Sequence, residues 1–405
     1  MAKKTSRKKV ATKSKAKTTR KPAAGKAAKK TGKAADLAGP GISTYPEVAK
    51  ILPTGYRALL NNKDTQKAIF EIKRYIEDGL AEELNLQMVQ VPLIVEKESG
   101  MNDNLDRDGS RTPVDFPCGL GIDPRMNVQV VQAATKWKRW ALTQYGCKLG
   151  EGINTDMRAV RKDYFLDHDH SSYVDQWDWE RVMSPRQRNL NYLKDTVRSI
   201  WKVLTGAEDM VQEMFPKLKT KRYPNLPKEL AFIHAEEILE RYPDLPRKQR
   251  ETRILNDYSP AVFIIGIGSV LDDGYPHEMR AADYDDWITD TSKSTGKKTY
   301  GLNGDILVWN HLTKRRHELS SMGIRVTKET LRKQLKLAGQ LDSLKLPYHK
   351  MIMKDQIPLS IGGGIGQGRV QMLLLRKAHF GEVTVTVWPK QLHKICEKKN
   401  IHVLT

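Results

Sequence analysis

The stretch Tyr173-Val-Asp-Gln-Trp-Asp-Trp-Glu180 decides the fold class, because polar and aromatic side chains alternate along it. Successive side chains of a strand point to opposite faces, so Gln176, Asp178 and Glu180 share one face and both tryptophans share the other. A strand that only filled a core would not carry three polar groups on one face. The alternation therefore predicts a strand whose tryptophans pack in a core and whose polar face is the floor of a cleft.

The spacing of apolar residues predicts helices and strands on both sides of this stretch. Helices are expected over 64–84 with Asp64 as N-cap, after the N-cap and N1 pair Ser184 and Pro185 with an apolar stripe from Leu190 to Leu204, and over 230–240, 327–338 and 370–377. Strands are expected over 86–95 with a bend or an edge at Pro92, over 261–270, 304–309, 318–326 and 383–387, and in 128–140 before the start of a helix. The pattern indicates one mixed α/β domain over residues 46–405.

The segment Gly362-Gly-Gly-Ile-Gly-Gln-Gly-Arg369 is the strongest local signal for a ligand, with five glycines in eight residues before a leucine-rich helix. A glycine-rich turn at a helix N-terminus lets backbone N–H groups approach a phosphate. The segment matches neither the P-loop nor the dinucleotide-binding pattern. Arg369 adds a planar, always charged cation suited to a triphosphate. Close helix packing is the alternative use of the glycines.

Acidic residues in the second half of the chain suggest a magnesium site. Asp305 and Glu318 each lead into a strand, and Asp283, Asp285 and Asp286 crowd into four residues. Mg²⁺ binds through one or two carboxylates and takes its other ligands from substrate phosphates and water. We therefore expect Asp305 and Glu318 to hold the ion, whereas the aspartates near 285 fit a solvated loop equally well.

Two other sets of potential ligands are interpreted as structural. Residues 167–170, Asp-His-Asp-His, resemble a metal cluster, but histidines so close in sequence rarely converge on one ion, and we expect a polar loop tip. The cysteines Cys118, Cys147 and Cys396 include no C-x-x-C pair, which excludes a dense disulfide scaffold and a cysteine zinc cluster.

The charge of the chain is concentrated at its N-terminus. The net charge is +21, and residues 1–40 hold 14 Lys and Arg against the single acid Asp36, with no aromatic residue. Such a composition predicts a disordered basic tail over residues 1–45. The tail fits an electrostatic arm that contacts nucleic acid non-specifically, a nuclear signal, or a solubilising tail without a partner.

The compartment is inferred from features that the sequence lacks. The longest apolar-leaning run, Ala261 to Leu271, has 11 residues, whereas a bilayer span needs about 20. The N-terminus has no apolar core of a signal peptide. These features favour a cytoplasmic protein without membrane contact.

Several strings resemble, in order, the ammonia-dependent (A-type) asparagine synthetases, the aspartate–ammonia ligases. They are Tyr173–Val182, Asp283–Trp287, Gly301–Trp309, Glu318–Val326 and Ile361–Arg369, with support from 133–139 and 242–245. The resemblance runs from about residue 64 to the end of the chain and excludes the basic tail. It implies the catalytic core of class II aminoacyl-tRNA synthetases: an antiparallel sheet flanked by helices, in a homodimer with the region around Pro92 at the interface.

The resemblance also implies a two-step reaction. The β-carboxylate of aspartate attacks the α-phosphate of ATP and releases pyrophosphate; ammonia then displaces AMP and gives asparagine. Arg161 would stabilise the reacting α-phosphate, and Arg369 with Mg²⁺ on Asp305 and Glu318 the leaving pyrophosphate. ATP would also contact Gly364 and Gly366. Lys138 would hold a carboxylate of aspartate, and the other aspartate-binding residues would be Asp103, Gln176, Asp178, Asp285 and Ser321. Asp285 would take the proton from ammonium, a role for which Asp103, Asp178 and Glu180 are alternatives.

One departure and three alternatives bear on this assignment. The second motif of the class usually reads aromatic-Arg-x-Glu, whereas Val160 precedes Arg161 here and Asp163 stands in place of the glutamate. An aspartyl- or asparaginyl-tRNA synthetase would share the fold and the adenylate, but residues 1–63 show no strands for the usual OB-fold. Residue 2 is Ala, which argues against a glutamine-dependent synthetase with an N-terminal Cys. A non-catalytic nucleic-acid-binding protein would not need the intact arginines and acids.

Overall fold

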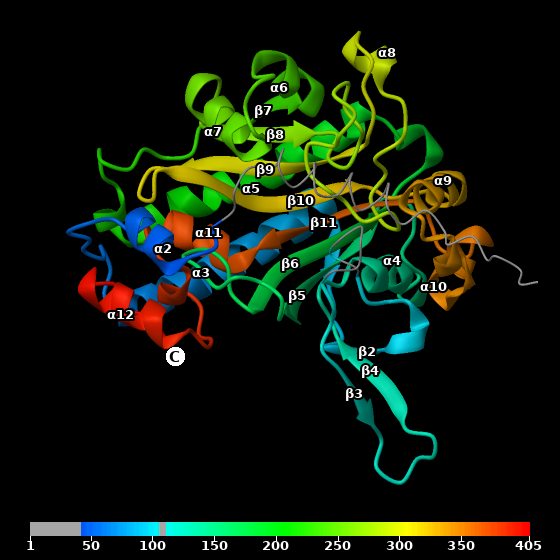
Figure 1. The fold of residues 1–405 in the computed structure, drawn as a ribbon, viewed down its shortest axis with the longest axis horizontal. Coiled ribbons are helices and arrows are strands. Elements are labelled where there is room, and N and C mark those ends of the chain that lie inside the picture. Colours follow the sequence, from blue (N-terminus) through cyan, green and yellow to red (C-terminus); the bar gives the residue numbers. More distant parts are fainter. Residues whose placement is uncertain (1–41, 104, 106–110) are drawn as a thin grey trace, which may run out of the picture.

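An eight-stranded sheet runs through the computed structural model, which describes residues 42–103, 105 and 111–405 (Figure 1). The strand order is β1-β5-β6-β11-β10-β9-β8-β7. The outermost pairs, β1 with β5 and β7 with β8, are parallel, and all pairs between them are antiparallel. The expected antiparallel sheet flanked by helices is therefore confirmed. Its strands are β1 Leu86–Met88, β5 Gly152–Val160, β6 Tyr173–Val182, β7 Ala231–His234, β8 Ala261–Ile265, β9 Asn303–Asn310, β10 Arg315–Ile324 and β11 Ser360–Gly366.

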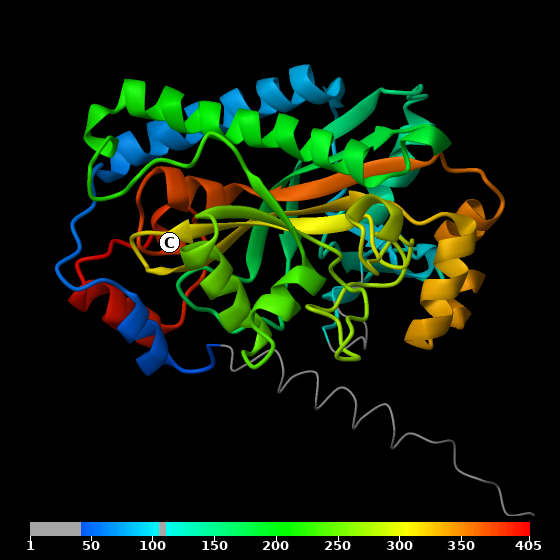
Figure 2. The ribbon, with the colours of Figure 1, turned by 90° about the horizontal axis from the view of Figure 1, so that it is seen from above.

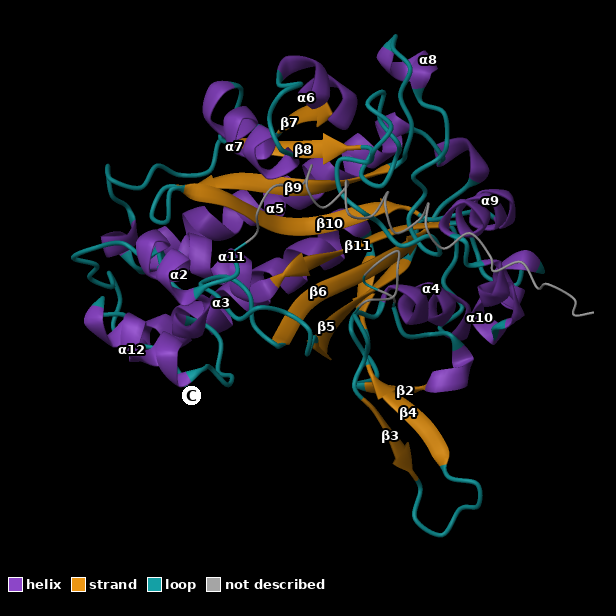
Figure 3. Cartoon of the chain, in the orientation of Figure 1, coloured by secondary structure: helices purple, strands orange, loops and turns teal. Residues whose placement is uncertain are grey.

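A smaller sheet projects from the body of the molecule (Figure 3). It has the order β2-β4-β3 and is antiparallel throughout. Its strands are β2 Ile94–Glu96, β3 Asp115–Cys118 and β4 Met126–Val130. The predicted strand over 86–95 is divided into β1 of the large sheet and β2 of the small one, and Pro92 lies in the connection across residues 89–93.

Two long helices, α3 and α5, cover one face of the large sheet (Figure 2). Their buried residues, among them Ile72 and Ile200, form one apolar core with Trp177 and Trp179 of β6. Both tryptophans are fully buried, as the alternation along 173–180 predicts. The polar face of the same strand is thereby left on the other side of the sheet.

The described helices are α2 Tyr45–Ile51, α3 Asn62–Leu84, α4 Thr135–Gln144, α5 Leu190–Met214, α6 Ala235–Arg241, α7 Arg247–Asp257, α8 Ser292–Thr295, α9 Lys328–Ala338, α10 Pro347–Met353, α11 Gln367–Leu374 and α12 Lys390–Lys398. The helices α3, α5, α9 and α11 lie where the apolar spacing predicts them and α4 begins within 128–140, whereas α2, α7, α8, α10 and α12 were not predicted. Within the described ranges, no helix combines the length and the apolarity that crossing a membrane requires. Residues 1–41 of the expected basic tail lie outside the described residues, and α2 begins at Tyr45.

Three local predictions are wrong. Ser184 precedes only a short 3-10 turn, and Asn189 caps α5 by accepting a hydrogen bond from the backbone N–H of Tyr192. The segment 230–240 is not one helix, since Ala231–His234 pairs with β8 before α6 begins. Residues 383–387 form no strand; Val385 and Val387 are mostly exposed, and β-branched residues favour a strand only where a neighbouring strand pairs with them.

The predicted N-cap of the first long helix is displaced by one turn. Asn61 caps α3, and its side chain accepts a hydrogen bond from the backbone N–H of Asp64, which lies in the first helical turn. An acid in the first turn is favourable at the positive end of the helix dipole, so the sequence signal at Asp64 is real but marks a different position.

Candidate active site

Four neighbouring strands set polar side chains in a row on the face of the large sheet opposite α3 and α5. Gly364 of β11 pairs with Asp178 of β6 on one side and with Ser321 of β10 on the other. Ser321 in turn pairs with Asp305 of β9. Residues paired across neighbouring strands point to the same face. Asp178, Ser321 and Asp305 therefore line one surface, with a glycine among them.

The glycines of β11 keep this surface open. A Cβ atom on Gly362 would overlap the carboxylate of Glu180, and one on Gly364 would lie 2.7 Å from Oε1 of Gln176. Neither position has room for a side chain while the polar residues of β6 occupy the space above the sheet. The glycine-rich strand thus forms the floor between the polar groups of β6 and those of β10.

The prediction of a phosphate-binding turn over 362–369 is wrong for most of its glycines. Gly362–Gly366 lies within β11, and its backbone is paired with β6 and β10. Amide groups engaged in sheet pairing are not free to hold a phosphate. Only the end of the segment meets the expectation: Gly366 is the N-cap of α11, and Arg369 lies in its first turn.

The Lys138 ammonium is buried at one end of this surface. Its Nζ atom pairs with Asp178 and donates to the carbonyl oxygen of Gly363 at 2.9 Å. An ammonium group has three donors, so one N–H of Lys138 remains for a ligand. Asp103 lies beside this group, where its Oδ2 accepts from the backbone N–H of Thr135 at 2.7 Å and its Oδ1 has no hydrogen-bond partner within the described residues.

Two buried arginines tie the acids of the surface together. Arg325, just after β10, donates to both carboxylate oxygens of Glu180 and pairs with Asp285. Arg280, from the loop between β8 and β9, donates to Asp305 at 2.6 Å and contacts Ser321 and Asp285. Asp285 therefore sits between two guanidinium groups.

The alternative that Asp285 and Asp286 belong to a solvated loop is excluded, because both aspartates and Asp283 are buried and bind different cations. Asp283 accepts from Lys136 and from His349, each at 3.0 Å, whereas Asp286 pairs with Arg188. Asp285 differs from the other two acids in contacting both Arg280 and Arg325. The other two anchor the segment that carries it.

The opposite end of the surface gathers cations around an aromatic ring. The Tyr164 ring lies 5.9 Å from the guanidinium carbon of Arg161 and stacks on the His170 ring at 5.9 Å between centroids. Nη2 of Arg369 lies 3.2 Å from Nε2 of His170, and Nη1 of Arg369 lies 3.8 Å from a carboxylate oxygen of Glu318. The segment from Arg161 to His170 therefore lies beside Arg369.

Burial perturbs several ionisable groups of the site. It raises the pKa of Asp103 to about 6. Burial and the nearby Glu318 raise the pKa of Asp305 to about 7, although Arg280 opposes the shift. Burial alone would lower the pKa of His170, but Asp169 and Asp167 raise it to about 9. Perturbed groups of this kind cluster at functional sites.

Among the predicted residues, Asp178, Ser321 and Asp305 share one face of the sheet. Lys138 reaches it from α4, Asp285 reaches it from a loop, and Arg161 and Arg369 lie near Tyr164 and His170. No sequence pattern assigned a role to Arg280, Arg325 or His170. The sequence held a signal for Arg325, because it stands between the apolar residues Ile324 and Val326 and a charged side chain buried there needs an acid. Arg280 lies in a long loop with no such pattern. The expected loop tip at 167–170 is wrong, because Asp167 and His168 are buried.

Comparison with known proteins gives the family. The sequence profile described as aspartate-ammonia ligase matches residues 63–400. The aspartate–ammonia ligase of Clostridium perfringens (strain 13 / Type A) is 45% identical over 353 residues, which cover 87% of this chain and 98% of that protein. The aspartate–ammonia ligase of Bacteroides thetaiotaomicron is 46% identical over 355 residues, 87% of this chain and 99% of that one.

Solved structures of aminoacyl-tRNA synthetases share the fold of this chain at low sequence identity. An asparaginyl-tRNA synthetase from Pyrococcus horikoshii, complexed with asparaginyl-adenylate, has a TM-score of 0.59 at 12% identity, covering 81% of this chain and 70% of that chain. The aspartyl tRNA synthetase from Entamoeba histolytica has a TM-score of 0.53 at 16% identity, covering 79% and 58%. The chain belongs to the aspartate–ammonia ligase family and has the fold of class II aminoacyl-tRNA synthetases.

Proposed function

We propose that this ligase makes asparagine from aspartate, ammonia and ATP through β-aspartyl-AMP. In the first step an oxygen of the aspartate β-carboxylate bonds to the α-phosphorus and pyrophosphate leaves. In the second step ammonia attacks the acyl carbon, the C–O bond to AMP breaks, and a proton is released. The observation that carries the proposal is the single surface over β11, which joins an end suited to an amino acid with an end suited to phosphates.

The end near Lys138 suits a zwitterion with a second carboxylate. The remaining N–H of Lys138 would donate to a carboxylate of aspartate. Asp103, Asp178 and Gln176 would accept from its ammonium group, and Ser321 would fix its orientation. Buried charges positioned in advance recognise such a substrate without reorganising at the moment of reaction.

The end near Arg369 suits the phosphates of ATP. The hydrogen bond from Arg369 requires an unprotonated Nε2 on His170, yet the raised pKa of His170 favours its cation at neutral pH. Two facing cations repel each other, and a phosphate oxygen between them would relieve the repulsion. Arg161 would stabilise the reacting α-phosphate and Arg369 the departing pyrophosphate. Gly364 and Gly366 would let ATP lie close to the sheet.

The residues present fit a magnesium ion at Asp305 and Glu318. Leu307 follows Asp305 by two residues on β9 and pairs with Glu318, so both carboxylates face the same side of neighbouring strands. The raised pKa of Asp305 supports this fit, because burial and the neighbouring Glu318 outweigh the effect of Arg280. When bound there, Mg²⁺ would neutralise charge on the phosphates of ATP. Arg280 would keep the Asp305 carboxylate oriented.

The candidates for the acid that takes the proton from ammonium can be reduced in number. Glu180 accepts hydrogen bonds from Arg325 and Ser360, and although burial opposes it, Arg325 lowers the pKa of Glu180. Asp285 is held between two arginines. Asp178 pairs with the Lys138 ammonium. Asp103 combines a raised pKa with a carboxylate oxygen that has no hydrogen-bond partner within the described residues, so it is better suited than the other three to accept a proton. The cytoplasmic location and the contact of the basic tail with nucleic acid stay predictions from the sequence.

Isotope transfer tests the route directly. With aspartate labelled by ¹⁸O in the β-carboxylate, Mg²⁺-ATP and ammonium, we expect AMP to carry one ¹⁸O per asparagine formed, detected by mass spectrometry. In a parallel reaction with ¹⁸O in the α-carboxylate we expect unlabelled AMP. AMP that takes up ¹⁸O from the α-carboxylate, and only when tRNA is added, would instead show an aminoacyl-tRNA synthetase.

The magnesium role of Glu318 is tested by Glu318→Gln. We expect the Mg²⁺ concentration for half-maximal ATP–pyrophosphate exchange to rise at least tenfold, because one of two anionic ligands is lost, while the KM for aspartate changes little. Glu329→Gln on the exposed surface of α9 is the matched control and should leave both values unchanged. Equal Mg²⁺ dependence in Glu318→Gln and in the parent enzyme would contradict the assignment.

The role of Asp103 in binding aspartate, the substrate of the step that ATP–pyrophosphate exchange reports, is tested by pH. Its raised pKa means that the carboxylate is present above pH 6 and is lost as the pH falls through that value. We expect kcat/KM for aspartate in ATP–pyrophosphate exchange to fall below pH 6, and Asp103→Asn to lower it at neutral pH and remove this limb of the profile. A limb that persists unchanged in Asp103→Asn would assign the titration to another group.

A homodimer through the small sheet explains the apolar surface there. Leu93 and Ile94 are 56% and 40% exposed beside Pro92, and Phe116, Leu120 and Met126 are exposed on the projecting β3–β4 hairpin. Exposed apolar groups gathered on one element mark an interface. We expect the mass of two chains by light scattering, and a shift toward monomer in Ile94→Lys. Leu337→Lys on α9, where the leucine is also exposed, should leave the dimer intact. A monomeric parent enzyme would contradict the proposal.

A further inference from the structure

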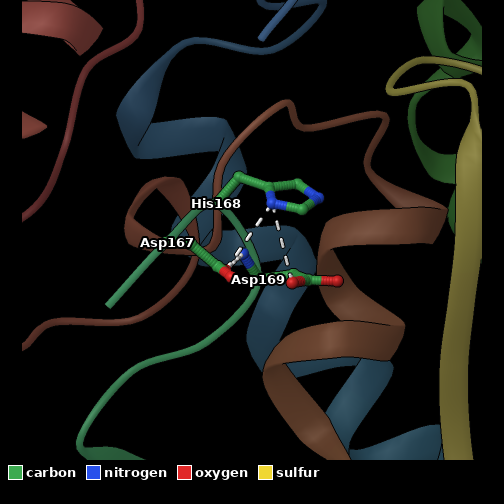
Figure 4. Close-up of side chains that lie close together, drawn as sticks. All are labelled: Asp167, His168 and Asp169. Carbon is green, nitrogen blue, oxygen red and sulfur yellow. Dashed lines mark hydrogen bonds and ion pairs between the residues drawn. The ribbon is translucent and has the colours of Figure 1, made fainter. Parts of the chain in front are cut away.

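The segment between β5 and β6 brings three metal-binding side chains together. Asp167, His168 and Asp169 each offer one ligand atom, and these atoms all lie within 4.8 Å of one another (Figure 4). Asp167 and His168 are only 3% and 2% exposed. The three residues are distinct from Asp305 and Glu318, so a metal bound by them would not depend on the proposed reaction.

The spacing of the three groups fits a metal better than direct hydrogen bonds. Nδ1 of His168 lies 3.6 Å from Oδ1 of Asp167 and 3.6 Å from Oδ1 of Asp169. Both distances exceed those of good hydrogen bonds. Two ligands in a tetrahedral zinc shell, with bonds near 2.1 Å, lie about 3.4 Å apart. The two distances from the ring nitrogen fit ligands of one ion, and the three ligand atoms together lie within 4.8 Å of one another. Oδ1 of Asp167 also accepts from the backbone N–H groups of Asp169 and His170, at 2.9 and 3.0 Å, which hold this carboxylate in place.

A second feature of the cluster is that Nδ1 of His168 has no hydrogen-bond partner within the described residues, although it is buried. A buried polar atom without a partner is costly. His170 engages the same two carboxylates through its own Nδ1, at 3.1 Å from Asp167 and 2.9 Å from Asp169, and leaves His168 unsatisfied. Figure 4 shows the His168 ring nitrogen directed toward both acids. An ion at this position would supply the missing partner.

We infer that Asp167, His168 and Asp169 form a binding site for a divalent transition-metal ion of the zinc class. An imidazole with two carboxylates suits Zn²⁺ and Co²⁺, whereas Mg²⁺ prefers oxygen ligands only. Three protein ligands leave a further position for water.

The cations around the cluster determine how tightly a metal ion is expected to bind there. His170 stands between the carboxylates and Arg369, and Nδ1 of His317 lies 3.6 Å from Oδ2 of Asp169. The cations His170 and Arg369 oppose a second positive charge, so the ion should bind more weakly than in a closed structural zinc site. An ion held here would fix the end of the segment that places His170 beside Arg369.

Metal titration of the full chain tests the inference. Tag-free protein is stripped with a chelator, and Zn²⁺ is titrated by calorimetry and Co²⁺ by visible absorption, both in excess Mg²⁺ so that carboxylate sites are filled. We expect one equivalent to bind, with the d–d absorption of a low-coordinate Co²⁺ site. His168→Ala and Asp169→Asn should each weaken binding at least tenfold. His402→Ala, which removes an exposed histidine, is the matched control and should not.

Folding and ligand identity are checked separately. Thermal unfolding shows whether the variants fold, and X-ray absorption at the cobalt edge of the parent protein should show imidazole scattering, a result that needs no variant. No equivalent bound in excess Mg²⁺ would overturn the inference. So would binding that survives in folded His168→Ala and Asp169→Asn, or a cobalt site with oxygen ligands only.

Discussion

The polar surface of this enzyme depends on β11, which has glycine at positions 362, 364 and 366 of the face that it turns toward the site. β11 lies in the middle of the large sheet, where both neighbouring strands direct charged groups over it. Because Gly362 and Gly364 leave the space above the backbone empty, Arg325 at the end of β10 can reach Glu180 on β6 across the intervening strand. A single methyl group at Gly362 would overlap the acid that this arginine binds. The open strand is thus what allows distant charges to form one site.

The charged groups above β11 are buried and paired. Their burial is unfavourable in free energy, and their pairing serves the electrostatics of the site. Removing an ion from water is expensive, and buried pairs add little net stability compared with apolar packing. Breaking one such pair by removing a partner typically destabilises a protein by about 3–5 kcal/mol. Their use is electrostatic, since Arg325, Arg280 and Lys138 hold acids in fixed positions before substrate arrives. The site is therefore ordered by pairs that span several strands.

The sequence predicted features that depend on a single helix or strand better than features that depend on contacts between elements. The alternation along 173–180 correctly placed both tryptophans in the core and the acids on the other face, because a strand has a fixed period. The glycines of 362–366 were assigned to a turn, since the same composition serves a phosphate loop and an unobstructed strand. Arg280 could not be predicted, as its loop is placed only by tertiary contacts. The 167–169 cluster was dismissed for its short spacing, although an irregular backbone can bring neighbouring side chains to one point.

The most direct test of the proposed site is a crystal structure with a non-hydrolysable analogue of β-aspartyl-AMP. We predict that the acyl phosphate lies over Gly364, with the amino-acid part toward Lys138 and Asp103 and the phosphate between Arg161 and Arg369. An analogue bound away from β11, or bound with its two ends reversed, would contradict the proposed site.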